Sequence, residues 1–168
     1  MPNQQQLEML KQEATGSWNT WRQEHLEMDL DLSEADLSDV SLGGVDLSRA
    51  NLSGADLCRV DLSNADLSHA SLVGANLKYA NLANVDLTGT DLSGANMLET
   101  RLDGAILRST ILLGTNLIGA DLSNADLSGA VLKGTYLGKA NLNGTVVTSE
   151  QLENTRSPDD FPEQQISS

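Results

Sequence analysis

From Leu32 to Val147 every fifth residue is apolar, without a break in phase. Leu occupies 22 of these 24 central positions, and the exceptions are Met97 and Val147. The residue two positions earlier is small, since after Leu30 it is always Ala, Val or Thr. A period of five matches neither the 3.6 residues of a helical turn nor the alternation of a strand. The chain must therefore turn a corner once per repeat.

The polar positions of the repeat predict where that corner lies. The residue before the central one is Asp ten times and Asn six times, and the second residue after it is Gly eleven times. Gly tolerates the positive φ that the third position of a type II turn requires. We expect each repeat to be a short extended side followed by a corner. The central residue and the small residue face inward, and the other three face outward.

Three segments follow from where the period holds. Residues 1–29 lack it, and their apolar residues fall at spacings of three and four, which predicts a helix that Gly16 could break in two. We expect this segment to cover the first coil as an N-terminal helical cap. The residues at these spacings are Leu7, Leu10, Trp18 and Trp21, with Ala14 between them.

Residues 30–149 carry the repeats, and residues 150–168 are expected to form a short C-terminal cap and a disordered tail. Ser149 followed by Glu150 fits the N-cap and first turn of a short helix. Leu152 keeps the phase of the central residues, and Phe161 is expected to fold back onto the last coil. This end is less well covered than the beginning and leaves room for end-to-end pairing.

Self-similarity at this period is typical of a solenoid, because one repeat cannot bury its Leu alone. The sequences Ala-Asn-Leu-Ser-Gly at 50–54 and Ala-Asp-Leu-Ser-Gly at 125–129 resemble the pentapeptide-repeat family. The N-terminal segment resembles the helix that precedes the repeats in cyanobacterial members. The resemblance implies an all-β solenoid, a right-handed quadrilateral β-helix with four repeats per coil and about six coils. Its length would be roughly 30 Å at the ~4.8 Å spacing of stacked strands.

Composition limits the partners of such a rod. The 168 residues include 24 Asp and Glu against 10 Lys and Arg, a formal net charge of −14. We therefore do not expect direct binding to nucleic acid, which depends on neutralising phosphates. Cys58 is the single cysteine, so no internal disulfide can form. We see neither a signal peptide nor a membrane span, and we expect a cytoplasmic protein without a membrane partner.

With four repeats per coil, residues twenty apart stack on one of four faces. The position before the central residue gives the first face an acidic column, interrupted by Ile106: Asp46, Asp66, Asp86 and Asp126. One interpretation is mimicry of DNA phosphates, by which some pentapeptide-repeat proteins act on DNA gyrase. The other is that Asp and Asn bond neighbouring backbone at this position. The charge count favours the second, since residues 31–149 hold 14 acidic and 7 basic side chains.

The second and third faces carry apolar residues in the C-terminal half. The candidate apolar patch comprises Leu98, Ile111, Leu113, Ile118, Val131 and Tyr136. A contiguous exposed apolar group often marks a contact surface, whereas scattered apolar residues do not. The alternatives are an interface with an unidentified protein, a homodimer through the C-terminal half or end, or incidental surface variation.

No catalytic or metal-binding pattern accompanies these surfaces. His25 and His69 are the only histidines, and no nucleophile–base or metal-ligand spacing occurs. Cys58 next to Arg59 is a weak redox candidate. We expect no cofactor and no enzymatic activity. The sequence predicts a protein-interaction scaffold, and the alternative is a DNA-mimicking modulator of DNA gyrase or another DNA-binding protein.

Overall fold

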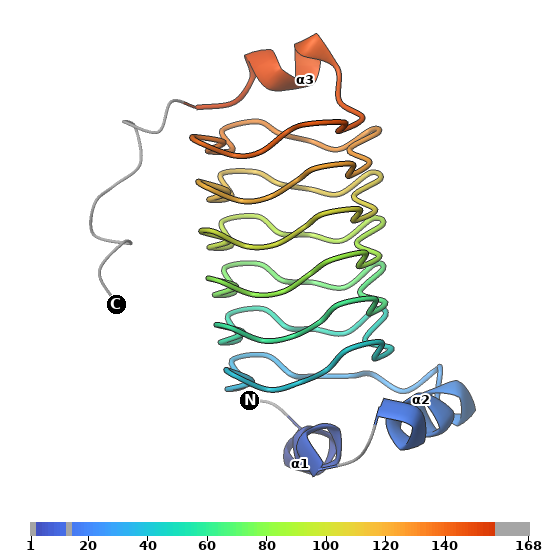
Figure 1. Cartoon of the computed structure of the whole chain (residues 1–168). Helices are drawn as coiled ribbons and strands as arrows, with labels where there is room; N and C mark the ends of the chain where they lie inside the picture. The colour runs from blue at the N-terminus through green and yellow to red at the C-terminus, as the bar shows by residue number, and fades with distance from the viewer. Residues whose placement is uncertain (1–2, 13–14, 157–168) are drawn as a thin grey trace.

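The computed structural model describes residues 3–12 and 15–156 and contains three helices within them. Helices α1 (Gln4–Gln12) and α2 (Thr15–Glu24) lie at the N-terminal end of a stack of coils, and α3 (Ser149–Glu153) lies at its C-terminal end (Figure 1). The N-terminal segment is thus in two pieces, as the sequence suggests. Gly16 lies in the first turn of α2 and does not break that helix, and Ala14 falls outside the described residues.

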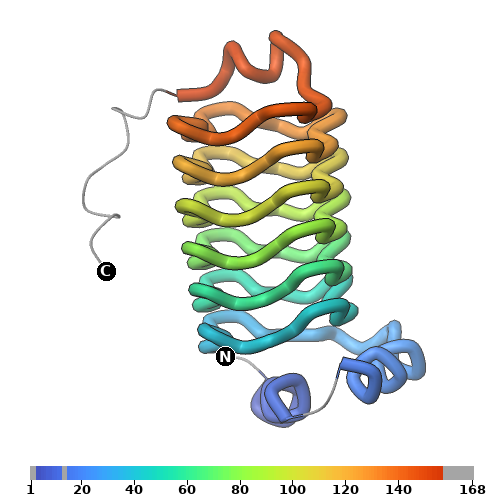
Figure 2. The backbone as a smooth tube through the Cα atoms, in the orientation of Figure 1, coloured from blue at the N-terminus to red at the C-terminus, as the bar shows by residue number. Residues whose placement is uncertain are grey.

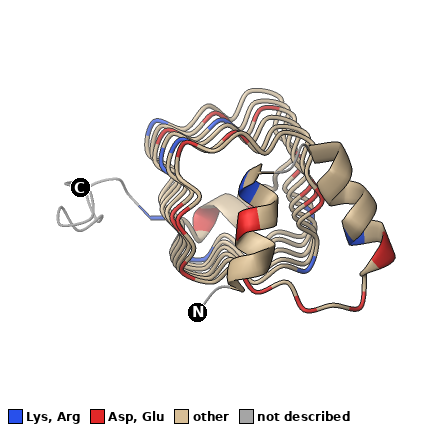
Figure 3. Cartoon of the chain, turned by 90° about the horizontal axis from the view of Figure 1, so that it is seen from below, with Lys and Arg blue, Asp and Glu red and all other residues tan. Residues whose placement is uncertain are grey.

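Between the helices the chain winds into a regular stack of coils (Figure 2), which has four sides when seen from its end (Figure 3). Parallel bridges join residues twenty apart, from Asp31 with Asn51 to Tyr136 with Arg156. The Asn51 amide donates to Leu30 O at 2.8 Å, which shows how one coil bonds to the next. Twenty residues make one coil, so each coil holds four repeats. The twenty-residue register from which the sequence analysis assigned the four faces is therefore confirmed by the structure.

Each repeat turns its corner where the sequence predicts. The Ala35 amide donates to Leu32 O at 3.2 Å, and the same closing bond recurs along the rod. The second residue after each central position has a positive φ, from residue 34 to residue 144. Eleven of these residues are Gly, but twelve are not, and they include Arg49, Tyr79 and Lys139. The corner thus accepts residues other than Gly, although the left-handed conformation is unfavourable for them by about 1–2 kcal/mol each.

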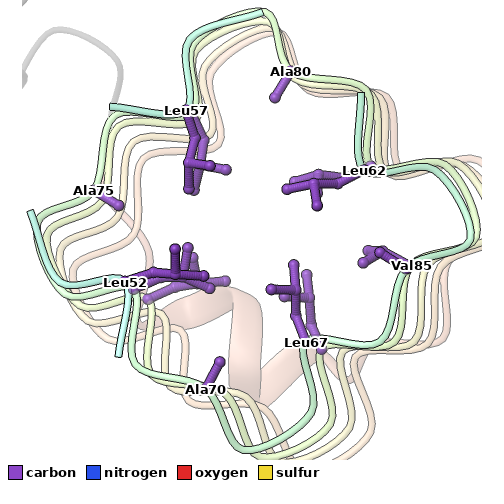
Figure 4. Packing of buried hydrophobic residues seen from close by; sticks show 14 of the residues in the cluster. Leu52, Leu57, Leu62, Leu67, Ala70, Ala75, Ala80 and Val85 are labelled. Carbon is purple, nitrogen blue, oxygen red and sulfur yellow. The ribbon is translucent and has the colours of Figure 1, made fainter. Parts of the chain in front are cut away.

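The interior of the tube is filled by side chains from all four sides. Leu52, Leu57, Leu62 and Leu67 point towards the centre, while Ala70 and its counterparts fill the corners (Figure 4). These five side chains are at most 3% exposed.

Threonine at the small inward position is accommodated by a hydrogen bond that the sequence analysis missed. The Thr110 hydroxyl donates to Leu87 O at 2.8 Å, 23 residues earlier. All six threonines at this position make the equivalent bond. A buried hydroxyl without an acceptor would be unfavourable, so this bond makes Thr compatible with the core.

Seen from below, α1 lies across the open end of the tube, and α2 lies along one side of the first coil (Figure 3). Leu7, Leu10 and Trp18 are buried in the core cluster, and Trp21 packs against it while partly exposed. The Trp18 indole N–H donates to Asp46 O at 2.8 Å, so the ring also satisfies a carbonyl at the edge of the coil. Hydrogen bonds and apolar burial together hold these helices to the rod.

Side chains of α2 bond further backbone groups along the same edge. Asn19 donates to Gly44 O at 2.9 Å and accepts from the Asp46 amide at 2.8 Å. Arg22 is 2% exposed and donates to His25 O and Ser48 O, both at 2.9 Å. The bonds to Gly44, Asp46 and Ser48 occupy backbone groups at the edge of the first coil that would otherwise be free to pair with another strand.

At the C-terminal end, the N-cap of α3 lies one residue earlier than the sequence suggests. Thr148, not Ser149, is the N-cap, and it forms a reciprocal capping box with Gln151. The Gln151 side-chain amide also donates to Leu127 O and Ala130 O, at 2.8 and 2.9 Å.

Leu152 packs against the core cluster while partly exposed, which follows from its phase. The predicted return of Phe161 onto the last coil and the expected disordered tail lie outside the described residues. None of the helices in the described part of the chain has the length and apolar character needed to cross a bilayer.

Candidate interaction surface

The position before each central residue, which carries the acidic column, has a defined structural role. In all sixteen repeats with Asp or Asn there, the side-chain Oδ1 accepts a hydrogen bond from the backbone amide two residues on. Asp86, for example, accepts from the Thr88 amide at 2.8 Å. This amide lies at the corner and is not among the backbone donors that join one coil to the next. The need for a short acceptor explains the pattern without reference to a ligand.

The acidic column itself is discontinuous. Asp46, Asp66 and Asp86 stack through successive bridges, but Ile106 separates them from Asp126. Arg108 forms an ion pair with Asp126, with Nε 2.6 Å from the carboxylate. The column thus presents three stacked carboxylates and a fourth that is neutralised.

Hydrogen bonding lowers the pKa values of five Asp carboxylates at this repeat position, of which only Asp126 belongs to the acidic column. The Ser128 hydroxyl and amide, followed by Arg108, lower the pKa of Asp126 to about 2. The serines two residues on likewise lower the pKa of Asp31, Asp36, Asp61 and Asp121. These five carboxylates therefore remain ionised well below neutral pH.

Five of the six residues of the candidate apolar patch lie on the surface as a group, which we call the exposed patch. Leu113 is 41% exposed and Val131 is 44% exposed, while the other three are partly exposed. The exposed patch comprises Leu98, Ile111, Leu113, Ile118 and Val131.

The register between coils holds this group together. Ile111 pairs with Val131 through a bridge on the second face. The Glu99 amide donates to Ile118 O at 2.9 Å, which stacks Ile118 over Leu98 at the corner that follows the third face. Leu113 lies at the corner between the two faces.

Tyr136 does not belong to this surface, and its expected exposure is wrong. It is 6% exposed, because the segment after α3 returns to the third face. Arg156 pairs with Tyr136 in a parallel bridge, its guanidinium lies 5.8 Å from the ring centroid, and its Nη1 donates to the Tyr136 hydroxyl at 3.1 Å. The sequence carries no five-residue period at 156 that would have placed this contact.

The remaining polar candidates are accounted for by local structure. His25 stacks on Trp21 with 4.8 Å between ring centroids, and its Nδ1 lies 2.7 Å from Trp21 O. Cys58 is a free thiol beside Arg59, whose guanidinium pairs with Asp39. His69 is exposed at a corner with φ +59°. Among the residues that the structure describes, no three His, Cys, Asp or Glu side chains gather in a way that could hold a metal ion.

Comparisons with known proteins agree with this geometry. The family model "Pentapeptide repeats (8 copies)" matches residues 31–68, 70–108 and 110–148. No curated protein matches the chain. A solved pentapeptide repeat protein from the Arabidopsis thaliana thylakoid lumen is 30% identical, with a TM-score of 0.56, over 65% of this chain and 72% of that one.

Two cyanobacterial structures are also similar. A pentapeptide repeat protein from Cyanothece 51142 is 30% identical over 84% of this chain and 98% of its own, with a TM-score of 0.47. One from Nostoc PCC 7120 is 33% identical over 67% and 84%, with a TM-score of 0.39. The family model covers well over half of the residues, and the chain belongs to the pentapeptide-repeat family, whose known structures are right-handed quadrilateral β-helices.

Proposed function

We propose that this protein is a non-enzymatic interaction scaffold that binds a protein partner through the exposed patch. Pentapeptide-repeat proteins are generally non-enzymatic structural repeat proteins. The observation that carries the proposal is the grouping of the exposed patch, whose apolar side chains lie on neighbouring coils at two adjacent faces. A group of this kind favours protein contact over isolated variation.

The distribution of charge supports the same surface. Residues 30–90 carry nine acidic and three basic side chains, a net charge of −6, whereas residues 91–149 carry five acidic and four basic, a net charge of −1. The exposed patch lies in the nearly neutral half. Contact there buries apolar area without bringing a strongly acidic surface against the partner.

Substitution within the exposed patch tests the proposal. The variant with both Leu113→Lys and Ile118→Lys places two charges where contact is proposed. The matched control, Ser63→Lys with Ser123→Lys, adds the same charge at the equivalent repeat position of the fourth face. Circular dichroism establishes that both variants fold.

The immobilised variants are then compared with the original chain for proteins retained from an extract of the source cells. We expect retention by the original and by the control, and loss from the patch variant. Equal retention by all three would refute the exposed patch as the binding surface.

Modulation of DNA gyrase or another DNA-binding protein stays an alternative prediction, carried by the acidic column. A supercoiling assay with gyrase tests it. A mimic would inhibit at micromolar concentration, and Asp66→Asn with Asp86→Asn would weaken the inhibition while keeping the Oδ1 acceptors. No effect of the original chain would remove this alternative.

A further inference from the structure

We propose that the exposed patch binds a second copy of this chain, antiparallel, about a twofold axis that crosses the third face at residues 111–130. The inference rests on the proposed function and names the partner of the same surface. Such an axis places the coil 111–130 opposite its own copy, and the coil 91–110 opposite the coil 131–150 of the other molecule. The two rods then overlap in their C-terminal halves.

The central coil supplies the apolar contact. Leu113 and Ile118 lie at the two corners that border the third face. Leu113 is 41% exposed, and Ile118 is partly exposed. In the antiparallel arrangement each lies opposite the same residue of the second copy. Because both rods repeat at the same ~4.8 Å spacing, each coil of one molecule stays level with a coil of the other along the contact.

The flanking coils supply complementary charge. Glu99 and Lys139 occupy the same corner column, two coils apart with Gly119 between them. Both are exposed, and neither forms an ion pair with any residue in the described ranges. The proposed axis brings Glu99 of each molecule opposite Lys139 of the other, which gives two equivalent ion pairs per dimer.

The same charges argue against a parallel pairing. A twofold axis along the rod would place Lys139 opposite Lys133, which lies at the other corner of the third face in the same coil. It would also bring the two acidic halves, residues 30–90 with a net charge of −6, side by side. The antiparallel arrangement directs those halves away from each other, and like-charge contact is avoided.

The overlap is small, so the dimer should be weak. The contact spans three coils, about 15 Å along the rod at the strand spacing. It therefore buries less surface area than a standard protein–protein interface. We therefore expect a dimer that forms over a micromolar range of concentration and weakens at high salt.

Sedimentation equilibrium of the purified chain, with charge-swapped variants, tests the proposal. Glu99→Lys or Lys139→Glu alone replaces two attractive contacts by two repulsive ones, which should raise the dissociation constant roughly tenfold. The double variant reverses both partners and should restore it. The matched control is Glu34→Lys, at the same repeat position, with its Cγ likewise over a glycine of the next coil.

Dimerisation that is weakened by each single variant, restored by the double variant and unchanged in the control would support the proposal. A monomer at all concentrations, or a dimer indifferent to the swap, would overturn it. The measurement uses purified protein alone, so its failure differs from that of the proposed function. If the chain stays monomeric but retains another protein through the exposed patch, the proposed scaffold function holds and the proposed dimer does not.

Discussion

Replacing Asp86 by asparagine and, separately, by alanine tests whether the acidic repeat position acts through charge or through one acceptor oxygen. The Asp86 Oδ1 accepts from the Thr88 amide at 2.8 Å, and both residues are partly exposed. Asparagine keeps an acceptor in the same place, as it does in six natural repeats. Alanine leaves the amide to water.

The magnitude follows from the energetics of such a bond. A side-chain acceptor on a partly exposed amide is worth about 1 kcal/mol, similar to a helix N-cap. We expect Asp86→Ala to lower the free energy of unfolding by that amount. Asp86→Asn should leave it unchanged or slightly higher, because the substitution removes repulsion from Asp66 in the neighbouring coil.

Urea denaturation followed by circular dichroism measures the difference, and urea leaves the electrostatic interactions unscreened. With a slope of about 2 kcal/mol per molar, the alanine variant should unfold roughly 0.5 M earlier. The asparagine variant should coincide with the original chain. If asparagine destabilises as much as alanine, charge rather than hydrogen bonding sets the preference, and the structural explanation of the acidic column is refuted.

Three further perturbations follow from the structure. The pKa of Asp126 is lowered from 3.8 to about 2, chiefly by Ser128. Its stabilising effect is therefore complete above pH 4 and is lost as the pH falls towards 2, so thermal unfolding should show a shallower acid dependence in Asp126→Asn; an identical acid dependence would contradict this. Trp18→Phe keeps an aromatic ring but leaves Asp46 O without its donor, and should cost about 1–3 kcal/mol by urea denaturation; an unchanged midpoint would show that the bond is not formed. Gly94→Ala meets nothing within 4 Å but has φ +66°, so it should cost about 1–2 kcal/mol, and a much larger loss would reveal a steric conflict.

The period of five predicted the core and the corner, because both depend on spacing alone. Leu52 and its counterparts must face inward wherever the chain turns every five residues. The corner was predicted from glycine, yet Arg49 and Tyr79 adopt the same positive φ. Pairing between coils holds the backbone there strongly enough to override the local preference of the residue. Sequence therefore located the corner without predicting which residues tolerate it.

The contacts at the two ends depended on information that spacing does not carry. The helical pattern indicated Trp18, but its bond to Asp46 O became visible only with the first coil in place. Arg22 lies four residues after Trp18, so helical spacing could have placed it on the same side. Tyr136 was misplaced because Arg156 returns to the third face after α3, outside the repeat pattern.

The twenty-residue register makes rod length and facing separately adjustable. Excising twenty residues, such as 51–70, would shorten the molecule by one coil and leave all surfaces in line. Excising five would turn everything beyond the deletion by a quarter revolution relative to α1 and α2. Gain or loss of a single repeat in the gene thus rotates a docking surface about the rod axis. Gain or loss of four repeats changes only its distance from the end of the rod.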